Sequence, residues 1–226
     1  MEKSIVRSIA LFCAIVIMGM LGVSAVEAAE KKKRDPGKTV YMRNTCLACH
    51  GRDGAKAIMD YPNLAGQDAK YMINQINYII SGKRLGRPDA TGNPRSEGMR
   101  GALVPPGETK SSLTKAQIKQ VSTWLSKQKP AKIKPPKTPL DPASVEAGKK
   151  LFKTKCRACH GKEGKKPLKG NPIVAGQKRD YLLIQLEDIK SKARKTPKTA
   201  AMYSVVKKLD GGQLGSLADY LSQVER

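Results

Sequence analysis

Two segments before residue 130 carry apolar residues at helical spacing. Between Asp68 and Ser81 the apolar positions share one face of a helix. They are Tyr71, Met72, Ile76, Ile79 and Ile80, with the polar Gln75 among them. The second segment begins at Thr114, with Gln117 three residues on, the spacing of a capping box. Its apolar stripe comprises Ile118, Val121, Trp124 and Leu125. Residues 82–107 are rich in Gly, Pro and Arg, which predicts a long irregular loop.

The second part of the chain repeats this pattern. At a spacing of 110, the residues Pro62, Gly66, Gln67, Tyr71 and Gln75 recur as Pro172, Gly176, Gln177, Tyr181 and Gln185. The last helix recurs at a spacing of 96, with the stripe Leu214, Leu217, Tyr220 and Leu221. The two spacings differ by 14 residues, which are extra sequence in the loop of the first half. The sequence therefore predicts an all-α fold, a tandem duplication of one helical module.

A proline-rich segment separates the two copies. Five prolines stand among lysines between Gln128 and Pro142, namely Pro130, Pro135, Pro136, Pro139 and Pro142. This composition is typical of an extended, semi-rigid linker. We therefore expect a first domain over residues 29–128, a Pro/Lys-rich linker over 129–142 and a second domain over 143–226.

The first residues have the pattern of an export signal. Two basic residues precede a largely apolar run, and Val26-Glu27-Ala28 is a small-residue cleavage site. We expect cleavage after Ala28, which removes a signal peptide over residues 1–28 and places the protein in the periplasm. A retained membrane anchor is the alternative, because the run is close to the ~18 residues that can span a bilayer.

Two C-x-x-C-H motifs occupy equivalent places in the repeat. They are Cys46, Cys49 and His50 in the first half, and Cys156, Cys159 and His160 in the second. This motif attaches a c-type haem, whose vinyl groups bond to the two thiols and whose iron the histidine ligates. Cys13 lies in the expected signal peptide, so the motifs use every remaining cysteine. We therefore expect two covalently bound haem c groups. One four-thiolate zinc site is a weak alternative, since its ligand pairs would lie much farther apart in sequence than is typical.

The second axial ligand of each iron cannot be a histidine of this chain, because both of its histidines belong to the motifs. A methionine thioether is the usual alternative, and it raises the reduction potential. Met202 is the only methionine of the second half. In the first half Met99 precedes the last helix, as Met202 does, and we prefer it to Met42, Met59 and Met72. Another ligand or water at the first iron stays open, because haem iron accepts several axial partners.

Each proximal histidine needs a partner for its other ring N–H, which fixes the ring orientation and the basicity of the ligand. The carbonyls of Pro62 and Pro172 are candidates, because a proline carbonyl is an acceptor on a restricted backbone. Prolines that only shape the loop are the alternative.

The chain is strongly basic, with a formal net charge of +24 that removal of residues 1–28 leaves unchanged. Basic residues cluster at 31–33, at 162–169, and along Lys190, Lys192, Arg194, Lys195 and Lys198. We expect this charge to steer the protein toward redox partners with acidic docking surfaces, or toward an anionic membrane surface. An ordinary solvated surface is the alternative. Nucleic acid also attracts such charge, but export and two haems argue against it as a partner.

The sequence resembles the cytochrome c4 family, two-haem electron carriers of the bacterial periplasm. The resemblance rests on both motifs with their following glycine, on Pro62-Asn-Leu-Ala-Gly66-Gln67 and on Ala175-Gly176-Gln177, and it covers nearly the whole mature chain. It implies a class I cytochrome c fold for each half, iron held by histidine and methionine, and histidine N–H bonds to the two proline carbonyls. The 14-residue excess around Met99 and the basic net charge depart from the family pattern.

The expected function is the transfer of single electrons between periplasmic or membrane-bound respiratory partners, without catalysis. Two closed six-coordinate haems offer no open iron position to a substrate. No further histidine, nucleotide-binding loop or carboxylate pair indicates a catalytic site. Two alternatives stay open: a cytochrome subunit of a dehydrogenase complex, and a dihaem oxidoreductase with one open haem site.

Overall fold

The computed structural model describes residues 34–136, 138–168 and 170–226. The predicted signal peptide, the basic cluster at 31–33 and Lys169 lie outside these ranges. Residues from Asp35 onward form one compact unit. Within the described residues the regular elements are helices, apart from one isolated bridge between Pro88 and Pro94.

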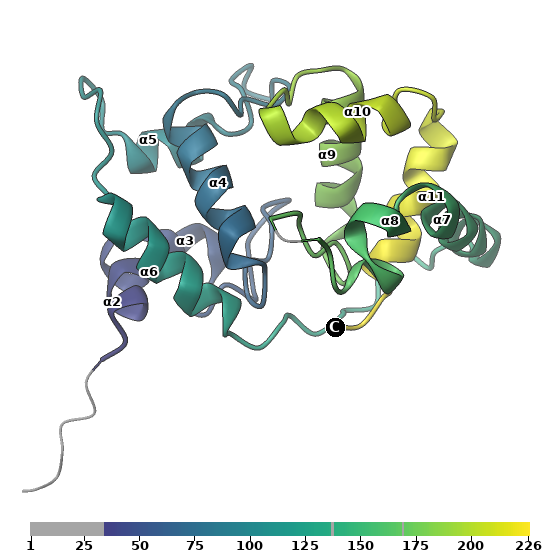
Figure 1. The fold of residues 1–226 in the computed structure, drawn as a ribbon, viewed down its shortest axis with the longest axis horizontal. Coiled ribbons are helices and arrows are strands. Elements are labelled where there is room, and N and C mark those ends of the chain that lie inside the picture. The colour runs from purple at the N-terminus through teal and green to yellow at the C-terminus, as the bar shows by residue number, and fades with distance from the viewer. Residues whose placement is uncertain (1–33, 137, 169) are drawn as a thin grey trace, which may run out of the picture. The chain divides into compact units, whose positions relative to one another are not determined.

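The helices of the two halves follow one another in the same order (Figure 1), which agrees with the predicted all-α tandem duplication. The first half contains α2 (Pro36–Arg43), α3 (Cys46–His50), α4 (Ala69–Ile80), α5 (Glu97–Leu103) and α6 (Lys115–Ser126). The second half contains α7 (Pro142–Lys155), α8 (Arg157–His160), α9 (Arg179–Lys190), α10 (Ala200–Val206) and α11 (Gly211–Ser222). Two short 3₁₀ turns, η1 (Lys162–Gly164) and η2 (Pro197–Thr199), complete the second half.

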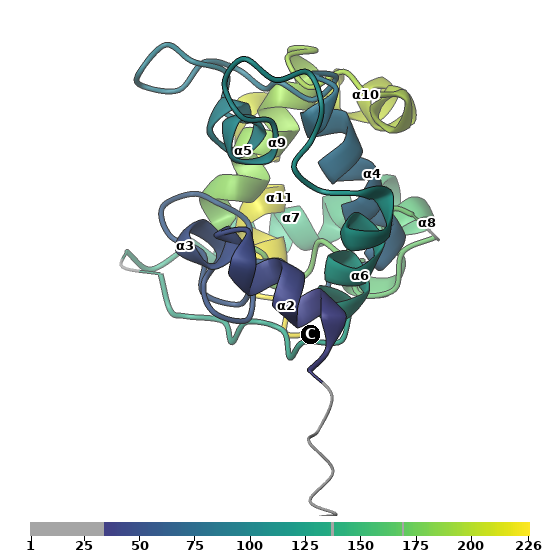
Figure 2. The same cartoon turned by 90° about the vertical axis from the view of Figure 1, so that its left-hand side faces the viewer.

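The first and last helices of each half cross at a glycine. Helix α2 packs on α6, and α7 packs on α11 (Figures 1 and 2). A Cβ atom at Gly37 would overlap the carbonyl oxygen of Gln120, and one at Gly148 would overlap that of Ser216. Glycine therefore lets each pair of backbones approach more closely than a residue with a side chain would.

An aromatic pair joins the same helices in each half. The ring centroids of Tyr41 and Trp124 are 5.0 Å apart, and those of Phe152 and Tyr220 are 5.8 Å apart. Both pairs are tilted, an arrangement that aromatic quadrupoles favour. The buried Tyr41 hydroxyl also donates a hydrogen bond of 2.6 Å to the carbonyl of Gly51, directly after the first motif. The core thus fixes the end of that motif.

Helices α4 and α6 agree with the two helices that the apolar pattern predicts. Asp68 caps α4 by accepting a hydrogen bond of 2.6 Å from the backbone N–H of Tyr71. Both bonds of the predicted capping box between Thr114 and Gln117 are present at the start of α6. The predicted stripes of α6 and α11 are buried throughout. The 96-residue spacing of the repeat therefore aligns two equivalent core helices.

Two short helices lie where the sequence predicts other structure. Helix α5 lies inside residues 82–107, so the expectation of an irregular loop is wrong for this part. Gly98 and Gly101 lower its helix propensity, but Met99 and Leu103 pack on the core, and tertiary packing stabilises short helices. Met202 precedes the last helix, as expected, but it belongs to a separate helix, α10, that the apolar pattern does not predict.

The apolar pattern alone does not predict α2 and α7. In both, an aspartate caps the helix and a proline occupies its first position, as Asp35-Pro36 and Asp141-Pro142. Proline is favoured there because the first helical N–H groups have no partner within the helix. This local signal predicts both helix starts.

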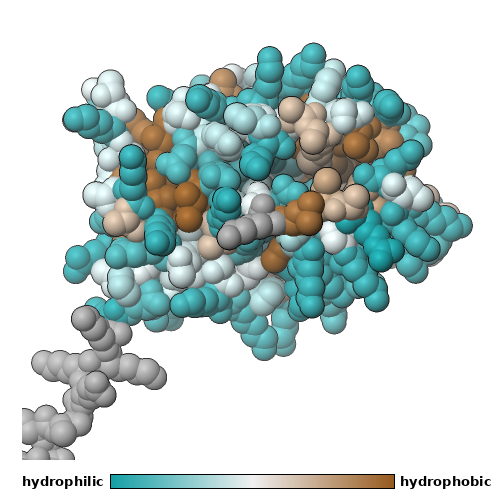
Figure 3. All heavy atoms as spheres, in the orientation of Figure 1, coloured by the Kyte–Doolittle hydropathy of each residue, from teal (hydrophilic) through white to brown (hydrophobic). Residues whose placement is uncertain are grey.

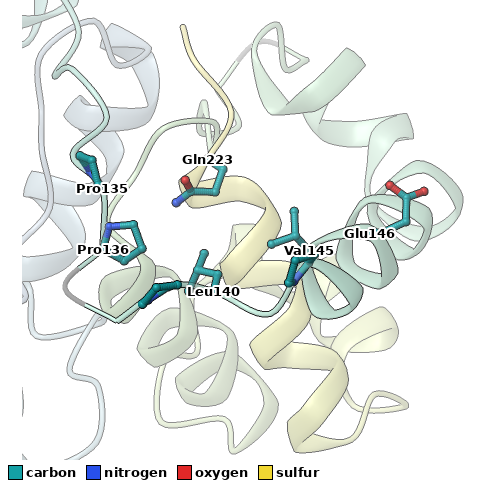
Figure 4. A pocket seen from close by; sticks show the side chains of 8 residues that line it. Pro135, Pro136, Leu140, Val145, Glu146 and Gln223 are labelled. Atoms are coloured by element: carbon teal, nitrogen blue, oxygen red, sulfur yellow. The ribbon is translucent and has the colours of Figure 1, made fainter.

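The described linker residues between α6 and α7 form neither helix nor strand. Together with α7 and the residue that follows α11, they line a groove of about 460 Å³ (Figure 4). Its walls are Pro135, Pro136, Pro139, Leu140, Pro142, Val145, Glu146 and Gln223. The prolines therefore hold the linker against the second half, and no motif cysteine, motif histidine or methionine lines this groove.

Candidate haem sites

The two motif histidines have equivalent surroundings. His50 ends α3 and is buried, and its Nδ1 lies 3.1 Å from the carbonyl oxygen of Pro62. His160 ends α8, and its Nδ1 lies 3.1 Å from the carbonyl oxygen of Pro172. A carbonyl can only accept, so Nδ1 carries the proton in both rings. Nε2 is then the nitrogen that is available to a metal.

Burial disfavours the charged form of both histidines. Burial lowers the pKa of His50 below its usual value; the bond to Pro62 opposes this, and the nearby charges of Lys178 and Arg84 add to it. Burial likewise lowers the pKa of His160, against the smaller effect of its bond to Pro172. Neutral imidazole is the form that binds a metal ion, so the fold keeps both side chains ready to ligate iron.

The four motif cysteines are free thiols with different exposure. Cys46 and Cys156 are half-buried, whereas Cys49 and Cys159 are exposed. Burial raises the pKa of Cys46, and it raises the pKa of Cys156 to about 11. Each half thus presents one thiol toward its core and one toward its surface. In the described part of the chain, no three His, Cys, Asp or Glu side chains gather as a metal cluster, so the structure lends the zinc alternative no support.

The methionines of the first half differ in burial. Met72 lies in the core with 5% of its surface exposed, whereas Met42 and Met59 are exposed, Met59 by 75%. Met99 is half-buried on α5 and packs against the core. Met202 is half-buried on α10 and packs against the core of the second half. Because α5 packs on α4 as α10 packs on α9, these two methionines occupy equivalent places.

Each half carries a rim of partly exposed apolar side chains around its core. In the first half this rim comprises Leu47, Leu64, Ile73, Ile76, Ile80 and Met99. In the second half it comprises Leu151, Val174, Leu183, Met202, Tyr203 and Val224. Figure 3 shows apolar side chains gathered over α4, α5 and α6, and again over α9 and α10. A flat apolar ring such as a porphyrin would remove such surface from water, so the residues present fit a haem in each half.

Comparison with known proteins identifies the family. The model of the cytochrome c family matches residues 35–129 and, a second time, residues 145–225. The chain belongs to the cytochrome c family. The two matches fall on the two copies of the repeat, and each includes one C-x-x-C-H motif.

Three relatives extend this result. The cytochrome c4 of Azotobacter vinelandii is 28% identical over 94% of this chain and 97% of its own length. The thiosulfate dehydrogenase electron acceptor of Thiomonas intermedia is 26% identical over 79% of this chain and 77% of its own length. The crystal structure of reduced recombinant cytochrome c4 from Pseudomonas stutzeri covers 84% of this chain and 97% of its own, with 27% identity and a TM-score of 0.66. The resemblance to cytochrome c4 is confirmed.

This cytochrome is therefore a dihaem c-type electron carrier, not an enzyme, and its two haem c groups are covalently bound. Its partners are redox proteins. Among the described residues, no helix is both long enough and apolar enough to cross a bilayer.

A pair of equivalent arginines links the two halves of the cytochrome. Arg84 and Arg194 are 110 residues apart. Arg84 donates to Gln75 of its own half at 3.2 Å and to Tyr181 and Gln185 of the other at 3.0 and 3.1 Å. Arg194 mirrors these bonds: it donates to Gln185 at 2.7 Å, to Tyr71 at 3.1 Å and to Gln75 at 2.9 Å. The contact between the halves is thus pseudo-twofold symmetric.

The prediction that Arg194 belongs to a basic surface cluster is wrong, because Arg194 is buried. Only 7% of its surface is exposed, and its Nε is buried without a hydrogen-bond partner. No carboxylate among the described residues forms an ion pair with Arg84 or Arg194. Burial raises the pKa of Tyr71, but the two guanidinium groups outweigh burial and lower it overall. The cluster therefore has surplus positive charge among the described residues.

Further contacts across the halves are not symmetric. Lys178 precedes α9 at the place where Asp68 caps α4, and no side chain caps α9. The Lys178 ammonium instead donates to the carbonyls of Ala57, Ile58 and Met59 in the first half, at 3.3 Å for Ile58 and 2.9 Å for Met59. The interface thus also depends on a residue that departs from the repeat.

Proposed function

We propose that each iron of this carrier is held by a histidine and a methionine, His50 with Met99 and His160 with Met202. Cys46 and Cys49, and likewise Cys156 and Cys159, form the thioether bonds. The haem supplies a one-electron couple when bound. The chain orients each imidazole through Pro62 or Pro172, covers the ring with apolar side chains, and leaves no coordination position for a substrate. The observation that carries the proposal is a repeated one: each half contains a motif histidine whose Nδ1 is bound to a proline carbonyl, and a half-buried methionine at an equivalent place in the fold.

Methionine variants test this ligation. Wild-type oxidised protein should show the weak near-infrared methionine-to-iron band at an intensity of two per chain. Met99→Ala and Met202→Ala should each remove one of the two, because each removes one thioether ligand. Met59→Ala is the matched control, since Met59 is a 75% exposed methionine of the first half, and it should keep both. A Met99→Ala protein with both bands intact would refute the assignment of the first iron.

We further propose that the redox partners of this cytochrome present acidic docking surfaces. The net charge of +24 supports this, as do the exposed basic residues near the second motif in sequence, Lys153, Lys155, Arg157, Lys162 and Lys166. Basic charge near a haem attachment motif raises the encounter rate with an acidic partner. Attraction to an anionic membrane surface rests on the same charge.

Our second candidate function is that of a cytochrome subunit in a dehydrogenase complex. The observation that favours it is the similarity to a thiosulfate dehydrogenase electron acceptor, over 79% of this chain. Purification of the cytochrome from its own cells would test this: a stable complex with a dehydrogenase favours a subunit role, and a free monomeric carrier contradicts it.

The domain boundaries and the location stay proposals. We propose a signal peptide over residues 1–28, domains over 29–128 and 143–226 with the linker 129–142 between them, and action in the periplasm. The export pattern of the sequence supports the location, because haem c attachment motifs follow it in the same chain. N-terminal sequencing of the exported protein would test the cleavage site.

A further inference from the structure

Two buried glutamines reach across from one half of the cytochrome to the backbone of the other. Gln177 donates from Nε2 to the carbonyl of Asn63 at 2.9 Å, and its Oε1 accepts the backbone N–H of Asn63 at 3.0 Å. Gln67 makes the same two bonds with Ile173, both at 2.8 Å. Each glutamine is 5% exposed. The pairs are equivalent, because Gln67 and Gln177, like Asn63 and Ile173, are 110 residues apart.

The backbone that each glutamine holds is the backbone that holds a motif histidine. The N–H of Asn63 and the carbonyl of Pro62 belong to one peptide group. That carbonyl lies 3.1 Å from Nδ1 of His50, and that N–H donates to Gln177. The peptide between Pro172 and Ile173 connects His160 to Gln67 in the same way. One planar, conjugated group therefore joins each histidine to a glutamine of the opposite half.

Hydrogen bonds at the two ends of a peptide strengthen each other. When Gln177 accepts the N–H of Asn63, the peptide is polarised and the Pro62 carbonyl becomes a better acceptor, by roughly 10–30% per bond in condensed-phase estimates. A better acceptor at Nδ1 makes the imidazole a more basic ligand. A more basic ligand stabilises ferric over ferrous iron, so it lowers the reduction potential.

We propose that Gln177 and Gln67 are positioning residues that set the reduction potential of the haem in the opposite half: Gln177 lowers the potential of the haem at His50, and Gln67 that of the haem at His160. The inference rests on the proposed ligation of iron by these histidines. The glutamines are uncharged, so they act through the hydrogen bond and not through a net charge. Loss of the contact between the halves would therefore raise the reduction potential of both haems.

The test replaces each glutamine in the full-length holoprotein and measures the potential of each haem separately, by redox titration followed by NMR of the haem methyl groups. Gln177→Met removes the acceptor of the Asn63 N–H at similar volume. It should shift the equilibrium constant for reduction of the haem at His50 by about threefold, or roughly 28 mV upward for a one-electron couple, and leave the other haem unchanged. Gln67→Met should do the reverse. Gln223→Met, an exposed glutamine after α11, is the control and should change neither.

A second variant covers the case in which the methionine replacements do not fold. Gln177→Asn shortens the side chain by one methylene group, which withdraws the amide from the Asn63 peptide without adding charge or volume. It should raise the potential of the haem at His50 and leave that of the haem at His160 unchanged. Shifts confined to the haem of the mutated half, equal shifts of both haems, or no shift would each overturn the inference.

The failure of this inference differs from failure of the proposed ligation. If wild-type protein lacks the two near-infrared methionine bands, the ligation fails before any glutamine is replaced. If the bands are present and the crossed shifts are absent, the ligation stands and only the action of the glutamines across the halves is wrong.

Discussion

Arg87 Nε of the first half lies 2.8 Å from Oδ1 of Asp188 in the second half, and only 1% of the Asp188 side chain is exposed. The second guanidinium end of Arg87 pairs with Glu187 at 2.5 Å. Arg87 belongs to the loop that carries the extra sequence of the first half, and Gly86 beside it donates to the carbonyl of Ala193 at 3.1 Å. This loop therefore contributes a contact between the halves that the repeat does not contain, because Pro197 stands 110 residues after Arg87.

Replacement of Arg87 should weaken this contact. Arg87→Ala leaves the buried Asp188 carboxylate without its main partner. A hydrogen bond to a charged group contributes ~1.5–3 kcal/mol; since 39% of the Arg87 side chain is exposed to water, we expect a loss of about 1–2 kcal/mol. Denaturant unfolding of the holoprotein measures it. Lys149→Ala, which removes an exposed pair with Glu146 at 3.6 Å, should cost less than ~0.5 kcal/mol. An equal loss of unfolding free energy in the two variants would show that the Arg87–Asp188 contact stabilises the protein no more than an exposed ion pair does.

The glycines at the helix crossings should resist substitution. Gly37→Ala and Gly148→Ala place a Cβ against the backbone of the partner helix, and such overpacking costs ~1–3 kcal/mol. Gly215→Ala on α11 is the matched control: nothing lies within 4 Å of its Cβ position, so higher helix propensity should stabilise the protein by about 0.5–1 kcal/mol. Thermal unfolding of the three holoproteins gives the comparison. A neutral Gly148→Ala would mean that the crossing tolerates a wider separation than the structure has.

Local chemistry made much of the molecule predictable. The spacing of Cys46, Cys49 and His50 is required by the covalent attachment of one haem, so the sequence alone predicts the attachment site. Helices α4 and α6 follow from apolar spacing and caps. Met202 is the only methionine of the second half, and its role as an iron ligand stays a prediction. The structure brings each motif histidine to its expected proline carbonyl.

The remainder depends on tertiary contacts that sequence spacing does not reveal. Arg194 stands in a run of lysines, which predicts an exposed position, yet it is buried because Tyr71, Gln75 and Gln185 surround its guanidinium. Gln67 and Gln177 recur in the repeat, but only the folded chain shows that they bond across the halves. Helix α5 depends on packing against the core, because its own residues favour helix weakly.

Electron transfer should depend on the sign of the reaction partner's charge. With ferricyanide, an anionic oxidant, the second-order rate should fall at least tenfold as salt shortens the screening length from ~30 Å to ~8 Å. With cationic hexaammineruthenium the rate should rise instead. Stopped-flow absorbance measures both. The double variant Lys162→Glu, Lys166→Glu should weaken the salt dependence of the ferricyanide rate. The double variant Lys115→Glu, Lys119→Glu on α6 is the matched control and should weaken it less. All four of these lysines are exposed. Rates that do not change with salt for either oxidant would contradict electrostatic steering by the basic surface.

The claim that this chain conducts electrons and does no bond chemistry is tested most directly by one redox titration of the exported wild-type protein, recorded by visible and near-infrared absorption. We predict two one-electron steps per chain, low-spin spectra throughout, two methionine-to-iron bands in the oxidised protein, and slow binding of added cyanide. High-spin features with rapid cyanide binding at either haem would contradict the account, because that iron would have an open position for a substrate.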